Sequence, residues 1–153
     1  MKTTVLAFLT ASFALSSTTF AADSSSAHAM KSGINSTKAK IENILRSQHF
    51  TLNAEANEND GPALSALMKA GDFLGRAGES IDISMVSYDA GDIDGGNYSY
   101  AVGCSRTGIA RSSLARSNIA ASTPPLGRLS AFSQEIKDVL DELTDLRTDG
   151  GCP

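Results

Sequence analysis

The chain has 153 residues, with 13 basic and 17 acidic side chains, a formal net charge of −4, 6% aromatic residues and no tryptophan. A mild acidic excess argues against nonspecific nucleic-acid binding, which needs a basic surface. The length is enough for one domain with its own hydrophobic core, and too short for two.

The N-terminus has the pattern of a secretory signal peptide over residues 1–21. Lys2 is followed by the apolar run TTVLAFLTASFAL, and Thr19 and Ala21 stand at the positions that signal peptidase reads. This run is shorter than the roughly 20 apolar residues that cross a bilayer, and no later run is longer, so we expect no membrane span in the mature chain. Without Lys2 the mature chain would carry 12 basic and 17 acidic residues, a net charge of −5. We expect it to be exported, periplasmic or secreted, with a flexible leader over 22–30.

Helical and strand periodicities then alternate along the sequence. Apolar residues at helical spacing predict a first helix that begins at about 31 or 36 and ends near 47. FTLNAEAN alternates strictly between apolar and polar residues, which predicts a half-buried strand over 49–57. Pro62, at a first helical position, opens a second, short helix.

Two further alternating segments predict strands over 80–88 and 97–104. Ile81, Ile83 and Met85 would share one face of the first strand. The second would carry Tyr98, Tyr100, Val102 and Cys104 on one face. After Pro124 and Pro125 break the chain, an apolar stripe in steps of three and four predicts an amphipathic helix of about 16 to 19 residues, which ends at Gly150 and Gly151. The sequence therefore predicts an α+β domain over 31–153, in which a small antiparallel sheet of about three strands packs against amphipathic helices.

The segment DAGDIDGGN, residues 89–97, connects the last two predicted strands. Asp, Asn and Gly tolerate turn geometry, so the segment fits a plain hairpin connection. It also offers hard oxygen ligands for calcium in Asp89, Asp92, Asp94 and Asn97. The spacing departs from the regular twelve-residue calcium loop, which closes with a bidentate Glu. The turn is therefore the favoured interpretation, and calcium is the alternative.

Cys104 and Cys152 are the two cysteines of the chain. In an exported protein such a pair predicts a disulfide, here between the last predicted strand and the end of the C-terminal helix. The alternative is a catalytic thiol, which needs a basic partner. After removal of the leader the one histidine is His49, so the disulfide is favoured.

Residues 95–134 contain no acidic side chain but four arginines. Three of them, Arg106, Arg111 and Arg116, lie in or beside the five-residue rhythm TGIAR-SSLAR-SNIAA, which fits a small-residue helix or an irregular arm. This arm either pairs weakly with the acidic C-terminal helix or presents guanidinium groups to the carboxylates, phosphates or sulfated glycans of a partner.

No nucleophile elbow, phosphate loop, dinucleotide fingerprint or metal triad is recognisable in the sequence. We therefore expect a noncatalytic exported module, without a cofactor, that binds a protein or glycan of the envelope or extracellular space. The alternatives are a small envelope hydrolase that uses carboxylates or His49, and a calcium-dependent adhesive module.

Overall fold

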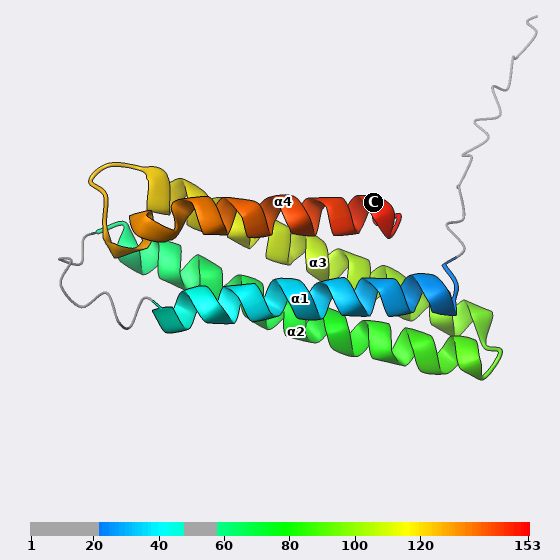
Figure 1. The fold of residues 1–153 in the computed structure, drawn as a ribbon. Helices are drawn as coiled ribbons and strands as arrows, with labels where there is room; N and C mark the ends of the chain where they lie inside the picture. The colour runs from blue at the N-terminus through cyan, green and yellow to red at the C-terminus, as the bar shows by residue number, and fades with distance from the viewer. Residues whose placement is uncertain (1–21, 48–57) are drawn as a thin grey trace, which may run out of the picture.

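The computed structural model describes residues 22–47 and 58–153, and this part of the chain is a bundle of four long helices (Figure 1). These are α1 (Ser24–Ser47), α2 (Asp60–Asp89), α3 (Ile93–Ser122) and α4 (Ser133–Asp149), and the short 3₁₀ helix η2 (Arg128–Phe132) leads into α4. The described residues form no strand. The predicted α+β class is therefore wrong, and the described fold is all-α.

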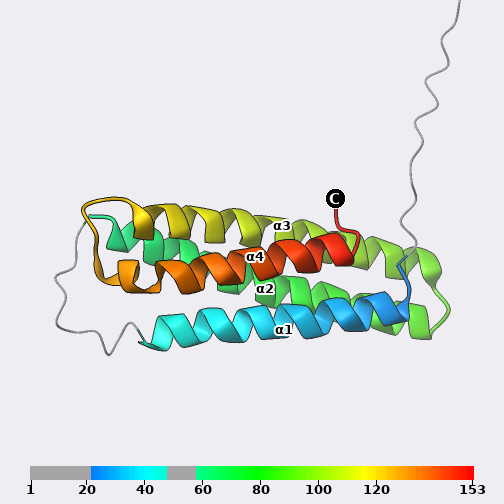
Figure 2. The ribbon, with the colours of Figure 1, turned by 45° about the horizontal axis from the view of Figure 1, so that its top comes forward.

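The four helices run antiparallel to their neighbours in sequence, and α4 returns to pack against α1 as well as α3 (Figures 1 and 2). The most extensive contact is between α2 and α3, which are the two longest helices. Their connecting turn extends beyond the end of α4 (Figure 2). The bundle is thus built on a long α2–α3 hairpin, with α1 and α4 packed along one side of it.

Helix α1 buries residues in steps of three and four, as an amphipathic helix does. The buried residues are Ala27, Met30, Ile34, Thr37, Ile41 and Ile44. The predicted first helix is present, but it begins earlier than expected. Residues 24–30, expected in a flexible leader, form its first two turns, because Ala27 and Met30 continue the buried stripe.

The predicted strand over 80–88 lies inside α2, and the sheet to which it was assigned is absent from the described fold. The apolar residues of 80–88 alternate as in a strand, but the residues that are buried follow helical spacing. Ile81, Ser84 and Tyr88 face the core, and Ile83 is exposed. Ser84 is fully buried at a position that looks polar in sequence, and its Oγ donates a hydrogen bond of 2.9 Å to the carbonyl oxygen of Gly96. That bond satisfies the hydroxyl within the core.

The predicted strand over 97–104 lies inside α3 for a related reason. The buried side of α3 is made largely of small or polar residues, so it shows no apolar helical stripe in the sequence. They include Gly96, Gly103, Thr107, Ala110, Ser113 and Ser117. A Cβ atom at Gly96 would lie 2.3 Å from Cε1 of Tyr88, and one at Gly103 would lie 2.6 Å from Cδ1 of Ile81. The two helices approach this closely because those side chains are missing.

The predicted C-terminal helix is confirmed as α4, which has 17 residues and ends next to Gly150. The second helix also exists, with Pro62 in its first turn, but it continues to Asp89 instead of ending early. The predicted signal peptide over 1–21 and the predicted strand over 49–57 lie outside the described residues.

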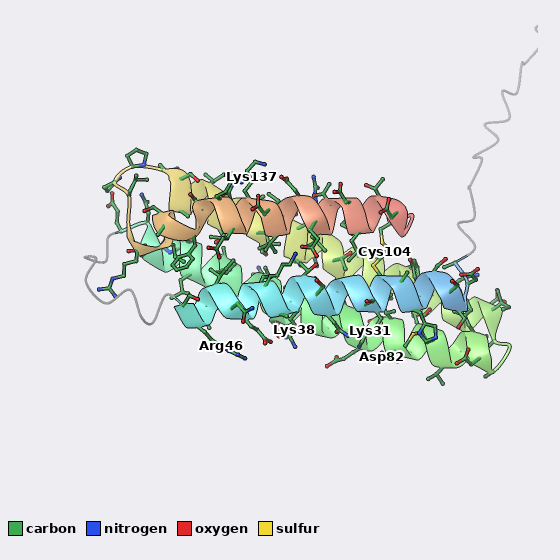
Figure 3. The ribbon with its side chains drawn as sticks, in the orientation of Figure 1. Lys31, Lys38, Arg46, Asp82, Cys104 and Lys137 are labelled. Carbon is green, nitrogen blue, oxygen red and sulfur yellow. A yellow bond between two sulfur atoms is a disulfide. The ribbon has the colours of Figure 1, made fainter. Side chains whose placement is uncertain are left out.

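The predicted Cys104–Cys152 disulfide is confirmed and joins α3 to the segment after α4 (Figure 3). Two side chains hold the same end of the chain. Tyr100 donates its hydroxyl to the carbonyl oxygen of Gly150 at 2.9 Å, and the guanidinium of Arg147 donates to the carbonyl oxygen of Cys104 and, at 2.8 Å, to Oγ1 of Thr107. The C-terminus is therefore fastened to the middle of the bundle.

Candidate functional site

The exposed apolar side chains of the described residues are distributed unevenly over the bundle. Large apolar side chains are exposed at Met68, Ile83 and Val86 on α2, at Ile93, Tyr98, Ile109 and Ile119 on α3, and at Leu126 in the following loop. Within the described chain, α1 and α4 have no such exposed residue. The apolar surface is thus concentrated on the α2–α3 hairpin.

Five of these positions share one side of the hairpin, namely Met68, Ile83 and Val86 on α2 and Tyr98 and Ile109 on α3. At one edge of this side the α2 row also lines a groove against α1, through Met68, Asp72, Arg76 and Glu79. On α2 the exposed residues follow one another in steps of three and four, which places them on a single helix face. A similar series follows α3. We call these two rows the outer face, and its residues are Met68, Asp72, Arg76, Glu79, Ile83 and Val86 on α2, with Tyr98, Val102, Ser105, Arg106, Ile109 and Arg116 on α3.

The outer face contains a groove near the α2–α3 turn. Its lining comes from both helices and consists of Ser80, Ile83, Tyr98, Ser99, Val102 and Arg106. The Tyr98 side chain is 74% exposed and Ile83 is 58% exposed, and Val86, one turn further along α2, is 70% exposed. An aromatic ring and aliphatic side chains therefore stand in water beside an arginine.

Arg106 is held in a defined position at the edge of this groove. Its Nη1 donates to the carbonyl oxygen of Arg76 at 2.7 Å and to Oγ of Ser80 at 2.6 Å. No carboxylate of the described residues lies within 4 Å of its guanidinium, as the ion pairs of the bundle involve other residues. A guanidinium has five N–H donors, so most of those of Arg106 remain available to a ligand.

The other arginines of the predicted binding arm do not join Arg106. Five residues of an α-helix rotate about the helix axis by one full turn plus about 140°. Arginines spaced by five residues therefore lie on different sides of α3. Nε of Arg111 donates to Oγ1 of Thr144 on α4 at 3.0 Å. Arg116 is exposed on the outer face, further along α3. The structure therefore brings only Arg106 and Arg116 to one face, and it separates Arg111 from them.

The acidic segment 89–97 is the turn between α2 and α3, so it connects helices instead of the predicted strands. Gly91 has φ of 78°, and Oδ1 of Asp92 caps α3 by accepting from the backbone N–H of Gly95 at 3.0 Å. Oδ1 of Asp89 accepts from the Ser24 hydroxyl at 3.2 Å, and Oδ1 of Asn97 accepts from the Tyr88 hydroxyl at 2.8 Å.

Three of the four predicted calcium ligands accept hydrogen bonds within the chain. Asp92 is engaged with its own helix N-terminus, Asp89 with α1, and Asn97 with Tyr88. Asp94 is exposed in the first turn of α3. Over the described ranges, no group of three or more His, Cys, Asp or Glu side chains could hold a metal ion. Calcium takes six to eight oxygens around one point, and three of the four predicted ligands here each have an oxygen engaged by a different donor of the chain.

Tyr100 and Arg147, the partly buried polar residues near the disulfide, hold the C-terminal segment in place. Burial raises the pKa of Tyr100 to about 12, because the ionised phenolate would lose its hydration. Burial also lowers the pKa of Arg147, with a smaller contribution from the positive charge of Arg111. Both side chains donate to carbonyl oxygens that hold the C-terminal segment in place. His49, the histidine considered for a hydrolase, lies outside the described residues.

Sequence reasoning missed the outer-face residues Ile83, Val86 and Tyr98 as a surface, because it placed them in a sheet. The sequence did contain an indication of an exposed apolar surface. If 80–88 and 97–104 are helical, they contain more large apolar residues than one face of a helix can bury. None of the described helices is long and apolar enough to cross a membrane. Comparison of the chain with protein-family models, with curated proteins and with solved structures finds no match.

Proposed function

We propose that the chain is an exported, noncatalytic module that binds another macromolecule through the outer face of the α2–α3 hairpin. The observation that carries this proposal is the row of exposed large apolar side chains on the outer face, Met68, Ile83, Val86, Tyr98 and Ile109. Isolated apolar residues are normal on a protein surface, but a contiguous apolar patch rimmed by polar groups is typical of an interaction site.

The composition of the groove supports protein recognition in particular. Tyrosine and arginine are enriched in protein–protein interfaces, and the groove pairs Tyr98 with Arg106. Arg106 is already oriented by Arg76 and Ser80, so little side-chain entropy is lost when it binds a carboxylate. A preformed groove of this kind fits an apolar side chain next to an acidic one.

The two alternative functions have weaker support from the geometry. A hydrolase through paired carboxylates needs two acids that face one site. In the groove between α1 and α2, the carboxylates lie among the basic side chains of Lys38 and Arg76. The oxygens of the acidic turn are directed to separate partners in the chain. We therefore favour the binding module.

Amine-reactive crosslinking in the native extract tests this proposal. Lys69 follows Met68 on α2 at the outer face, whereas Lys40 on α1 and Lys137 on α4 lie elsewhere on the bundle. We expect crosslinks to a partner to concentrate at Lys69 in the mature, oxidised protein. They should be lost in the variant Ile83→Asp.

The matched control is Leu126→Asp, because Leu126 is 62% exposed, close to the 58% of Ile83, but lies in the loop after α3. This variant should keep the crosslinks, and both variants should keep the melting temperature of the natural chain. Crosslinks that are as frequent at Lys40 and Lys137 as at Lys69, or that survive Ile83→Asp, would refute the outer face as the binding site.

A further inference from the structure

Two tripeptides of the chain have the pattern that accepts an N-linked glycan, which is Asn, then any residue except Pro, then Ser or Thr. They are Asn35-Ser36-Thr37 in α1 and Asn97-Tyr98-Ser99 in α3. We propose that Asn35 is a glycosylation site and that Asn97 is not. This inference rests on the export in the proposed function, because N-linked glycans are added to chains on the secretory route.

Asn35 is an exposed residue in the middle of α1. Its side chain makes no hydrogen bond with the part of the chain that the structure describes. Asparagine forms helices less well than alanine, lysine or glutamate, because its amide competes for backbone hydrogen bonds. The contacts of the described fold therefore give no reason for an asparagine at this position.

The surface around Asn35 leaves room for a sugar. Residues three and four positions apart are neighbours on a helix surface, so Ser32 and Ala39 lie beside Asn35. Both residues are exposed, and both have short side chains. A sugar joined to the Asn35 amide would therefore extend into water along this part of α1.

The two charged neighbours of Asn35, Lys31 and Lys38, turn toward α2 (Figure 3). Nζ of Lys31 forms an ion pair with Asp82 of α2 at 2.5 Å. Nζ of Lys38 is 3.8 Å from the position that a Cβ atom at Gly75 of α2 would take. A glycan on Asn35 therefore displaces neither lysine from its place against α2.

The second tripeptide lies in a more crowded position. Asn97 is partly buried in the first turns of α3, and its Oδ1 accepts from the Tyr88 hydroxyl at 2.8 Å. It also lines a pocket together with Ala22, which is only 6% exposed. A glycan on the Asn97 amide would disturb these contacts, so the fold accommodates a glycan at Asn35 and not at Asn97.

The transfer is a substitution at the anomeric carbon of the first sugar. Its donor is an oligosaccharide that is joined through pyrophosphate to a polyprenyl lipid. The side-chain nitrogen of Asn35 forms a bond to the anomeric carbon, and the bond from that carbon to the pyrophosphate oxygen breaks. The lipid pyrophosphate leaves with the electron pair, and the amide proton passes to a base of the transferase.

The geometry of α1 requires this transfer to precede folding. The pattern needs a hydroxyl at its third position, so the transferase must reach Thr37 as well as Asn35. Thr37 is fully buried in the folded chain, and its Oγ1 donates to the carbonyl oxygen of Gly33 at 2.9 Å. The folded chain thus hides one of the two groups that the transferase needs, and the glycan is added while the chain is unfolded.

The mass of the protein isolated from the cells that make it, before and after treatment with an N-glycosidase, tests the site. We expect one glycan, on the tryptic peptide 32–38 that contains Asn35. It should be lost in Asn35→Gln and also in Thr37→Val, which keeps the asparagine and replaces the hydroxyl by a methyl group of similar size. The matched control is Ser99→Ala, which removes the second tripeptide, leaves Asn97 unchanged and should keep the glycan.

An unmodified Asn35 in the isolated protein, or a glycan on Asn97, would overturn the inference. If that unmodified protein lacked residues 1–21 and contained the disulfide, export would be supported and the proposed function would still stand. If it kept residues 1–21 and had reduced cysteines, the export in the proposed function would fall as well.

The order of transfer and folding has its own test, with a purified transferase and its lipid-linked donor. The unfolded peptide 32–38 should accept the glycan. The folded, oxidised chain, prepared without a glycan, should remain unmodified, because Thr37 is buried. A folded chain that is modified as fast as the peptide would overturn this order.

Discussion

Reduction of the Cys104–Cys152 disulfide should lower the free energy of unfolding by about 4 kcal/mol. The two cysteines are separated by 48 positions, and in the chain-entropy model the closure of a loop of this length restricts the unfolded chain by that amount at 25 °C. The loop contains the second half of α3, η2 and α4, so the bond restrains about a third of the chain. A domain of this size has a total stability of about 5–15 kcal/mol, so the loss is large but leaves a folded protein.

Urea unfolding followed by helical circular dichroism, with and without a dithiol reductant, measures this loss. The reduced chain should keep its helical signal in the absence of urea, because Tyr100 and Arg147 still hold the C-terminal segment to the bundle. A double variant with Cys104→Ala and Cys152→Ala should match the reduced chain and should not respond to reductant. Equal stability of the oxidised and reduced chains would refute the entropic reasoning, and a response of the double variant would show that the reductant acts elsewhere.

Three further predictions concern single sites. As the pH rises from 10 to 12, the free energy of unfolding should fall by roughly 2 kcal/mol, because the unfolded state releases the Tyr100 proton near pH 10 while burial keeps it bound in the folded state up to a pKa of about 12. Tyr100→Phe should reduce this fall when the free energy of unfolding in urea is measured at each pH. An equal dependence on pH in both proteins would contradict the prediction. Gly96→Ala should lower the free energy of unfolding by about 1–3 kcal/mol, because the new Cβ would clash with the Tyr88 ring. Gly61→Ala is the control, because a Cβ there has open space and should not lower the melting temperature. Equal melting temperatures of the two variants would contradict close packing of α2 and α3. The melting temperature should be the same in EDTA and in calcium, and a calcium-dependent rise that Asp92→Ala removes would support the calcium site instead of the plain turn.

The sequence alone was sufficient to predict the C-terminal helix and the disulfide. The helix could be predicted because Ile136, Val139 and Leu143 form a wide apolar stripe at helical spacing, and such a stripe fits no strand. The disulfide could be predicted because an apparent export signal and a single pair of cysteines leave one intramolecular pairing. The acidic segment was also recognisable as a turn from its glycines and aspartates, although not which elements it joins.

Only the tertiary structure decided that α2 and α3 are helices along their whole length. Their contact surface uses glycine at 96 and 103 and serine at 84 and 117, which are residues that a hydrophobic pattern does not count as core. These residues are buried because each serine donates to a carbonyl oxygen of the facing helix and each glycine leaves room for a neighbouring side chain. Such partners belong to another helix, so no local window of sequence contains them.

The location of the candidate site was also decided by the tertiary structure. Ile83 and Tyr98 are apolar, and in sequence they have the same character as buried residues such as Ile81 and Tyr100. Their exposure depends on which side of the α2–α3 hairpin α1 and α4 cover, and that is determined by packing between segments far apart in the chain. The sequence thus determined which residues are apolar, and the assembly of the bundle determined which of them remain in contact with water.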